Sequence, residues 1–309
     1  MKEPLVNPIQ TPVDAASVVD FMSETIVAKE DMAKWRTAEA YRSALRSFQQ
    51  FRKAADIPLP EIDSRLMAAY EAWLGSHGLC PNSRSFYLRI LRAVYNRAVE
   101  QGLTPQRFPF KYTYTGVERT HKRAIELSTM RKIKELELRN GSTLELARDM
   151  FLFSFYTRGM AFVDMAYLKK QDLRGDTLYY RRHKTGQQMM VHWETQMQAV
   201  VDKYAVPSSP FLLPIIHTQG QDERKQYLYA SHNINRSLKK IGKQLNLPAP
   251  LTMYVARHAW ASIARSKNVP LSVISEGMGH DSEATTRIYL ATLDTIAVDN
   301  ANRLILNSI

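Results

Sequence analysis

One stretch of the chain, Asp176–Trp193, has the residue types of a β-hairpin, whereas helical periodicity precedes and follows it. Its two halves, Thr177–Tyr180 and Met189–Trp193, are rich in threonine, valine and aromatic residues, and they flank Lys184-Thr185-Gly186. Runs of this kind on either side of a glycine-containing turn predict two antiparallel strands. We therefore expect a mainly α (α+β) protein with a small antiparallel sheet and with Lys184 at the hairpin turn.

Helices are expected throughout residues 18–102. Apolar residues recur at steps of three and four in Trp35–Phe51, a second helix is expected over Asp63–Gly75, and the clearest one follows Pro81-Asn82 and ends at Gly102. The apolar residues of this last helix fall within an arc of about 120°, and they are Tyr87, Leu88, Leu91, Val94, Tyr95 and Ala98.

The opposite side of that helix carries Arg89, Arg92 and Arg97. It is either a solvated face or a surface that binds phosphates, and periodicity alone leaves both open. From Phe108 to Arg123, proline, threonine and aromatic residues disfavour a helix. This segment is expected to be a basic linker that crosses a DNA backbone, or else a surface loop, and its cations are Lys111, Arg119, Lys122 and Arg123.

Helical periodicity returns near Leu127. Leu144–Tyr156 is apolar on nearly all sides, which is typical of a buried helix, and shorter helices are expected over Thr195–Tyr204 and His232–Leu245. The tail from Thr295 to Ile309 is weakly amphipathic, and its apolar residues are Ile296, Ala301, Leu304 and Ile305.

The charge of the chain favours a polyanionic partner. Basic residues exceed acidic ones by 42 to 30, which gives a net charge of +12 and a pI near 9.7. Residues 1–120 hold 16 basic and 13 acidic residues, and residues 121–309 hold 26 and 17. The second half is therefore the expected place for phosphate chemistry.

Cys80 is the one cysteine, which excludes an intrachain disulfide and a multi-cysteine metal site. The N-terminal residues lack the apolar core of a signal peptide, and no apolar run approaches the length of about 18 residues that a membrane span needs. A soluble, cytoplasmic protein without a membrane partner is expected.

Residues suited to phosphoryl transfer gather in Leu251–Thr292, which contains Arg257, His258, His280 and Tyr289. Transfer of a phosphodiester without a metal needs a nucleophile, cations against the developing charge, and a proton donor for the departing oxygen. Tyrosine can be the nucleophile, and the planar guanidinium of arginine matches the oxygens of phosphate. Gly277 and Gly279 allow the backbone to turn tightly before His280.

The order and spacing of these residues resemble the C-terminal signature of the tyrosine recombinases, the phage integrase family. The matching segments are Ala256-Arg257-His258, Gly277-Met278-Gly279-His280 and Thr286-Arg287-Ile288-Tyr289. The resemblance implies that Tyr289 is the nucleophile, that Arg257 and His280 bind the phosphate oxygens, and that Lys184 protonates the leaving 5′ oxygen. His258 is expected to be a supporting or structural residue, since adjacent helical side chains diverge by about 100°.

Two positions depart from the family pattern. Tyr254 replaces the histidine of the usual His-x-x-Arg box, and because a phenol is a poor base near neutrality, it is expected only to hydrogen-bond the phosphate or to orient a neighbour. In the Thr-Gly-Leu-Arg-x-x-Glu box, matching Asp164 to the acid puts Ala161 at the arginine position. Arg158 lies three residues earlier, about one helical turn away. We expect Arg158 to take the arginine's role and Asp164 to be a buried supporting residue.

No metal and no cofactor are expected. His183 and His192 flank the hairpin without a third ligand nearby, and the sequence has neither a carboxylate cluster nor a glycine-rich phosphate loop. A covalent phosphotyrosine keeps the energy of the broken bond, so rejoining would require neither a metal nor a nucleotide.

The resemblance also implies a domain plan. It comprises a flexible arm (1–13), a helical core-binding (SAM-like) DNA-binding domain (14–107), a linker (108–123), a catalytic domain (124–292), and a tail (293–309) that docks on a neighbouring protomer or packs on its own chain. The plan favours DNA contacts for Arg89, Arg92, Arg97, Lys111, Lys122 and Arg123. Double-stranded DNA of the nucleoid is the expected partner, bound by a homo-oligomer that is a tetramer on synapsed DNA, with a monomer left open for the free protein.

The predicted function is a site-specific DNA recombinase or integrase that cleaves and rejoins strands through a covalent 3′-phosphotyrosine. A second interpretation is a regulator or architectural DNA-binding protein of the same fold whose catalysis has decayed, and Tyr254 and Ala161 are its best support. A third is a relaxase of the type IB topoisomerase kind, which would act without sequence preference or synapsis.

Overall fold

The computed structural model describes residues 16–118, 125–280, 282–290 and 306. The chain divides into two compact units between Thr120 and His121. Each unit has its own apolar core, as expected of separate domains. The predicted arm at 1–13 lies outside the described residues, and Leu306 is the one described residue of the predicted tail.

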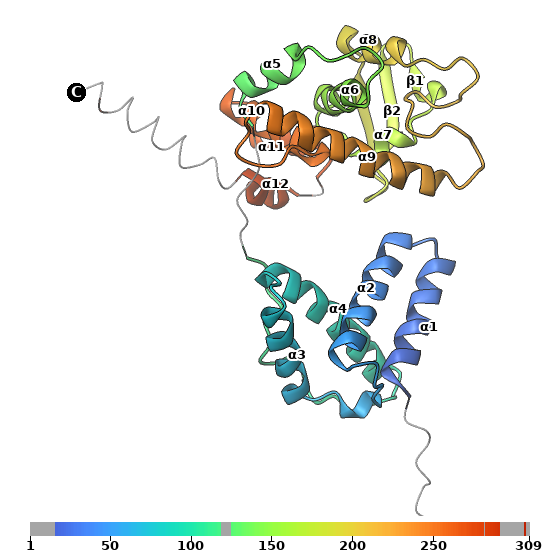
Figure 1. The fold of residues 1–309 in the computed structure, drawn as a ribbon, viewed down its shortest axis with the longest axis vertical. Helices are drawn as coiled ribbons and strands as arrows, with labels where there is room; N and C mark the ends of the chain where they lie inside the picture. The colour runs from blue at the N-terminus through green and yellow to red at the C-terminus, as the bar shows by residue number, and fades with distance from the viewer. Residues whose placement is uncertain (1–15, 119–124, 281, 291–305, 307–309) are drawn as a thin grey trace, which may run out of the picture. The chain divides into compact units, whose positions relative to one another are not determined.

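The N-terminal unit is helical over its described residues (Figure 1). Its helices are α1 (Val18–Asp31), α2 (Trp35–Phe51), α3 (Ser64–Ser76) and α4 (Pro81–Glu100), with a short 3₁₀ turn at Leu59–Glu61. The start of α3 is fixed by Asp63, whose carboxylate accepts a hydrogen bond of 2.7 Å from the backbone N–H of Leu66. The predicted stripe of α4 faces the core: Tyr87 is partly buried against it, and Leu88, Leu91, Val94, Tyr95 and Ala98 are all buried.

The segment predicted as a linker packs on the N-terminal unit over its described part. Phe110 is buried in the core of this unit. The Ser85 hydroxyl donates to the Gly116 carbonyl at 2.6 Å, and the Glu118 N–H donates to the Asn82 side chain at 2.7 Å. The Tyr114 N–H also donates to the Glu71 carboxylate of α3 at 3.1 Å, so residues 110–118 are anchored along α3 and α4, a feature that composition did not indicate.

The C-terminal unit is built around α6 (Thr143–Tyr156), which packs against α5, α8, α9 and α10 (Figure 1). Those helices are α5 (Leu127–Glu135), α8 (Thr195–Lys203), α9 (Glu223–Gln244) and α10 (Met253–Ser266). Because α6 is surrounded, it buries residues on most of its circumference, as its apolar sequence predicted. Helix α9 begins nine residues before the predicted start at His232, since the Asp222 carboxylate caps it by accepting from the Lys225 N–H.

A three-stranded antiparallel sheet lies in the same unit. It has the order β1-β2-β3, with β1 at Leu173–Arg174, β2 at Thr177–Arg181 and β3 at Gln188–His192. In the β2–β3 hairpin Tyr180 pairs with Met189, and residues 182–187 form the turn that carries Lys184. The predicted hairpin is confirmed, and the two-residue β1 was not predicted.

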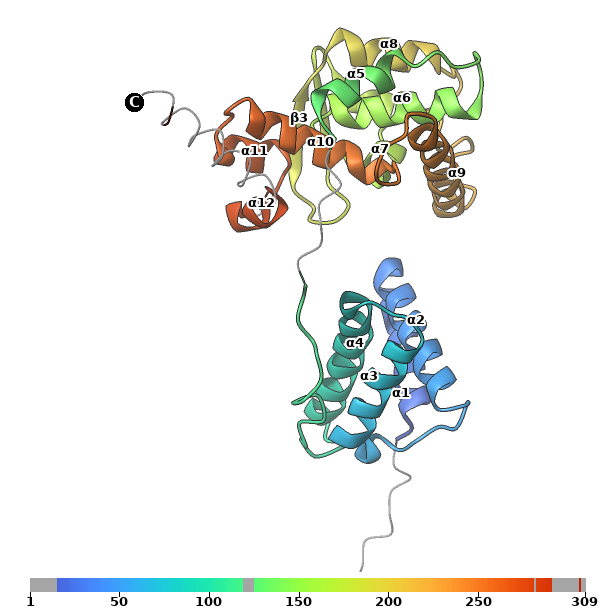
Figure 2. The same cartoon turned by 60° about the vertical axis from the view of Figure 1, so that its left-hand side comes forward.

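The described part of the unit also contains three short α-helices and a 3₁₀ turn: α7 (Phe162–Ala166), α11 (Leu271–Gly277), α12 (Glu283–Leu290) and the turn at Lys170–Asp172. Figures 1 and 2 show α12 beside α11, and it also contacts α10. The side chains of Thr285 and of residues 288–290 lie outside the described part, so Tyr289 is placed only by its position on α12. Within the described residues, no helix combines the length and the apolar character that a bilayer crossing needs.

Candidate active site of the C-terminal unit

Arg257 on α10 joins two loops that are far apart in sequence. It is 8% exposed, and a buried guanidinium needs hydrogen-bond partners. Its Nη1 donates to the Gly159 carbonyl at 2.9 Å, and its Nη2 donates to the Met278 carbonyl at 2.6 Å. Gly159 leaves room for this contact, because a Cβ there would lie 2.6 Å from the Arg257 Cα. Arg257 thus connects the end of α6 to the turn after α11.

His280 lies in that turn and contacts Arg257 directly. Its Nε2 is 3.1 Å from the Arg257 Nη2, and its Nδ1 is 2.7 Å from the Thr286 hydroxyl on α12. The turn depends on Gly279, which has φ +62° and a position where a Cβ would lie 2.6 Å from the Met189 sulfur. Gly279 therefore allows the tight turn predicted before His280, because it adopts a left-handed backbone conformation that other residues rarely adopt.

Arg158 follows the end of α6 in an unusual conformation. Its φ is +61° and that of Gly159 is +77°, so two successive left-handed residues redirect the chain. The prediction that one helical turn separates Arg158 from Ala161 is wrong. Helix α6 ends at Tyr156, and Ala161 is the N-cap residue of α7. The reversal sends the Arg158 side chain past Gly277 toward β3, where its Nη1 donates to the Met190 carbonyl at 3.3 Å.

Tyr180 on β2 lies within electrostatic range of three arginines. Burial raises the pKa of its phenol to about 12, and the negative charge of Asp164 contributes to the rise. The positive charges of Arg257, Arg182 and Arg158 oppose it. The half-buried Tyr180 phenol therefore interacts electrostatically with all three arginines, which come from α10, the hairpin and the loop after α6.

The Lys184 turn is held on both sides. Asp164 is buried on α7 and accepts from the His183 N–H at 2.8 Å, with the His183 Nδ1 at 3.3 Å. The Arg182 N–H donates to the Gln187 carbonyl at 2.9 Å, which closes the turn. Lys184 itself is exposed at the tip. Asp164 is thus buried as expected, and it supports the residue before Lys184.

Arg182 and Thr286 are two site residues to which the sequence assigned no function, although Thr286 belongs to the matching segment that ends at Tyr289. Arg182 is 8% exposed, and its Nη1 donates to the Gly279 carbonyl, so it joins the hairpin to the turn of His280. Thr286 is fully buried and contacts His280. An arginine at a strand end and a threonine in a helix are usually exposed, and nothing in the local pattern distinguishes these two.

Tyr254 and His258 form a pair on α10. The Tyr254 ring is 60% exposed and stands edge-on to the His258 ring, with 4.4 Å between the centroids. His258 is buried, although it directly follows Arg257. His258 therefore packs against the ring of the exposed Tyr254.

The sequence of the chain matches two profiles in the order of its two units. Residues 17–114 match the phage integrase SAM-like domain, and residues 129–295 match the phage integrase family. The chain belongs to the phage integrase family of tyrosine recombinases. Its activity is site-specific DNA recombination, and its fold is the mainly helical fold of that family.

Known recombinases are similar to this one over most of its length, in sequence and in fold. It is 21% identical to the tyrosine recombinase XerC of Leptospira interrogans over 258 residues, which is 82% of each chain. A lambda integrase dimer bound to a COC′ core site aligns with a TM-score of 0.67 and 16% identity, over 89% of this chain and 77% of that chain. A lambda integrase tetramer bound to a Holliday junction aligns with a TM-score of 0.64 and 16% identity, over 90% and 83%.

The predicted DNA contacts of the recombinase divide between described and undescribed residues. Arg89 and Arg92 are exposed on α4, and Arg97 is half-buried. Arg92 donates to the Thr115 hydroxyl at 3.0 Å, and the exposed Lys111 lies 5.3 Å from the centre of the Tyr112 ring. Lys122 and Arg123 lie outside the described residues.

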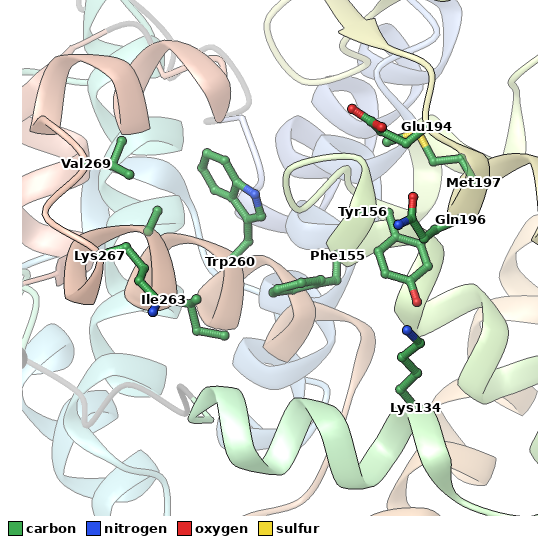
Figure 3. A pocket seen from close by; sticks show the side chains of 11 residues that line it. Lys134, Phe155, Tyr156, Glu194, Gln196, Met197, Trp260, Ile263, Lys267 and Val269 are labelled. Atoms are coloured by element: carbon green, nitrogen blue, oxygen red, sulfur yellow. The ribbon is translucent and has the colours of Figure 1, made fainter.

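The recombinase also has an apolar cavity of about 530 Å³ in its C-terminal unit (Figure 3). The cavity lies between α10, the end of α6 and the start of α8. Apolar lining comes from Phe155, Tyr156, Met197, Trp260, Ile263 and Val269, and charged lining from Lys134, Glu194 and Lys267. Trp260 also packs on Gly277, since a Cβ at Gly277 would lie 2.9 Å from its ring. The cavity wall therefore contacts the segment that leads to His280.

No group of three or more histidine, cysteine, aspartate or glutamate side chains in the described ranges is arranged to hold a metal ion.

Proposed function

We propose that the recombinase cleaves one DNA strand by attack of Tyr289 on the scissile phosphate. The bond from Tyr289 oxygen to phosphorus forms, the bond from phosphorus to the 5′ oxygen breaks, and a 3′-phosphotyrosine and a free 5′ hydroxyl result. Attack by the 5′ hydroxyl of a partner strand reverses the step. The observation that carries the proposal is the contact of Arg257 with His280. His280 is also hydrogen-bonded to Thr286, on the helix that contains Tyr289.

Arg257, Arg158 and His280 are proposed to bind the non-bridging oxygens. Preorganised donors of this kind stabilise the charge that develops in the transition state. All three surround the turn at residues 277–280, which supports a common target. A free phenol has a pKa of about 10, so a nucleophilic tyrosine depends on such a cationic environment.

Lys184 is proposed to protonate the leaving 5′ oxygen. Its place at an exposed hairpin tip suits a group that must reach into bound DNA, and an amine gives up a proton more readily than a guanidinium. Asp164 and His183 would keep the base of the turn in place while the tip moves. Tyr254, at the exposed first turn of α10, is proposed to donate a hydrogen bond to the same phosphate.

A nicked suicide substrate tests the proposal. After cleavage, the short fragment that carries the free 5′ hydroxyl diffuses away, so rejoining is prevented and the adduct accumulates. The adduct survives denaturation because it is covalent. We expect an adduct with the unchanged protein and none with Tyr289→Phe, which still binds DNA. Specific binding without any adduct would instead favour the DNA-binding module that has lost catalysis, and an adduct that persists in Tyr289→Phe would show that another residue is the nucleophile.

For DNA binding, we propose that α4 and the segment after it contact phosphates through Arg89, Arg92, Arg97, Lys111, Lys122 and Arg123. The exposed guanidinium groups of Arg89 and Arg92 support this role. Phosphate contacts carry little sequence information, so these residues would set affinity and register. The substrate is double-stranded DNA, and the proposed place of action is the nucleoid in the cytoplasm.

For assembly, we propose a tetramer on two synapsed sites, in which residues 293–309 of one protomer occupy the apolar cavity of the next. The cavity lies in the catalytic unit, and the tail has apolar residues at Ile296, Leu304 and Ile305. Removal of residues 293–309 is expected to leave single-site binding intact and to abolish the tetramer in analytical ultracentrifugation with DNA. A tetramer that survives the deletion would overturn this arrangement.

A further inference from the structure

Thr286 is the buried polar residue nearest in sequence to Tyr289 among the described residues of α12. Its side chain is fully buried, and its hydroxyl lies 2.7 Å from the Nδ1 of His280. Position 286 precedes position 289 by three residues, which is about one helical turn. The hydrogen bond therefore connects the helix of the proposed nucleophile to a proposed phosphate ligand.

The partner on the other side of the ring fixes the direction of the hydrogen bonds. A guanidinium group donates and cannot accept. The Arg257 Nη2, at 3.1 Å, therefore donates to the His280 Nε2, and a neutral imidazole then carries its proton on Nδ1. In this arrangement Nδ1 donates to the Thr286 hydroxyl oxygen.

We propose that Thr286 is a positioning residue that holds the His280 ring with Nε2 toward Arg257 and the phosphate site. This inference rests on the proposed function of Tyr289 and His280. A hydroxyl both donates and accepts, so Thr286 can pair with Nδ1 whether or not that nitrogen carries the proton. When phosphate takes the place of Nε2 as the acceptor from Arg257, His280 can donate from Nε2 without losing the partner on Nδ1.

The same bond makes the orientation of His280 depend on the docking of α12. Helix α12 contacts α11 and α10, and His280 lies in the turn between α11 and α12. When α12 is in place, Thr286 orients the histidine. When it is displaced, the ring loses this partner, so cleavage is coupled to the position of the nucleophile's own helix.

The test compares Thr286→Val, Thr286→Ser and the unchanged protein in single-turnover cleavage of the suicide substrate. Valine keeps the volume and removes the hydroxyl, whereas serine keeps the hydroxyl. Loss of an orienting hydrogen bond is expected to slow cleavage on the order of 10- to 100-fold in Thr286→Val, with unchanged DNA affinity. Thr286→Ser should restore most of the rate.

A double-mutant cycle with His280→Ala separates positioning from packing. If Thr286 acts through His280, Thr286→Val slows the His280→Ala protein little further, because the group that it orients is gone. Equal slowing in both backgrounds, full activity of Thr286→Val, or equal loss in Thr286→Ser would each overturn the proposal. Thr113→Val is the matched control, since Thr113 is also buried with a bonded hydroxyl but lies in the N-terminal unit.

A spectroscopic measurement covers the case in which Thr286→Val folds poorly. Nitrogen-15 shifts of the His280 ring, recorded on the Thr286→Ser and unchanged proteins, report which nitrogen is protonated. A proton on Nδ1 in the DNA-free protein is expected, and a proton on Nε2 alone would overturn the assignment. If Tyr289→Phe abolishes the adduct and Thr286→Val does not reduce it, this inference fails while the proposed function stands; an adduct in Tyr289→Phe means that the function itself fails.

Discussion

The two units bury different kinds of polar side chain. In the described part of the N-terminal unit, the buried polar residues are serines and threonines: Thr25, Ser47, Ser85, Thr104 and Thr113. The described part of the C-terminal unit buries ionisable groups as well: Glu145, Asp149, Asp164, Arg182, Arg257 and His258. Buried charge is unfavourable unless it is paired or hydrogen-bonded, so it gathers where catalysis or a polar network requires it.

This difference separates the two surfaces that are proposed to contact DNA. The basic face of α4 belongs to one helix, and an ordinary apolar stripe on the same helix fixes it in place. The Arg257 site is assembled from the loop after α6, helix α10, the turn after α11 and the hairpin. The face of α4 should tolerate substitution of one residue, whereas the Arg257 site should depend on each of the hydrogen bonds that join its elements.

The largest effect is expected at Arg257. Arg257→Lys keeps a positive charge but cannot donate to Gly159, Met278 and His280 from one planar group. We expect the rate of adduct formation to fall on the order of 10²- to 10³-fold, the scale of a lost oxyanion donor. Single-turnover cleavage measures it, and Arg265→Lys, at the other end of α10, is the control. A fall in this rate of less than about tenfold, or 1.4 kcal/mol, would mean that the site does not depend on the joint hydrogen bonds of Arg257 to Gly159, Met278 and His280.

Gly159→Ala tests how tightly the linked loops are packed. The new Cβ would lie 2.6 Å from the Arg257 Cα at a φ of +77°. We expect a loss of about 1–2 kcal/mol from the backbone and a further 1–3 kcal/mol from overpacking. Gly141→Ala separates these terms, because Gly141 has φ +71° and nothing within 4 Å of its Cβ position. Equal loss of urea resistance in the two variants would rule out the packing contribution.

A smaller effect is expected of acidic pH on the stability of the two units. Burial alone would raise the pKa of Asp149, but hydrogen bonds from Arg148, Lys203 and Tyr204 outweigh it and hold the pKa below its ordinary 3.8. A depressed folded pKa stabilises the fold above the unfolded value, and the stabilisation is lost as pH falls through the folded pKa. The C-terminal unit should therefore lose stability below about pH 4, before the N-terminal unit does.

Hydrogen exchange at pH 7 and pH 3 resolves the units. Asp149→Asn should weaken the acid sensitivity of the C-terminal unit while lowering its stability at pH 7, because Lys203 loses an ionic partner. Asp176→Asn, at an exposed carboxylate, is the control. Acid sensitivity that is equal in both units would contradict the contrast between their cores.

The smallest effect is expected on α4. Arg92→Ala should weaken binding to specific and non-specific DNA alike and reduce the slope of log K against log salt by about 1. Arg36→Ala, an exposed arginine that is paired with Glu39 on α2, is the control. An unchanged salt slope for Arg92→Ala would mean that this face of α4 is merely solvated.

Much of the architecture was predictable because it follows from local periodicity. The ends of α2 matched the prediction, and the buried stripe of α4 and the strands of the hairpin were identified correctly. The start of α9 was predicted nine residues late because its first turns are polar and only the cap at Asp222 marks them. The two-residue strand β1 has no detectable pattern, since it exists only through its pairing with β2.

The sequence by itself determined the family of the chain and the residues proposed for its chemistry: an arginine, a histidine and a tyrosine at fixed spacing, with a lysine at a hairpin turn. Only the tertiary structure decided how the Arg158 side chain reaches Gly277 and β3, since that depends on two left-handed residues after α6. The tertiary structure also brought in Arg182 and Thr286, whose partners are 97 and 6 residues away. The physical reason is that spacing along a helix or strand is set by backbone geometry, whereas contacts between loops are set by how separate elements pack.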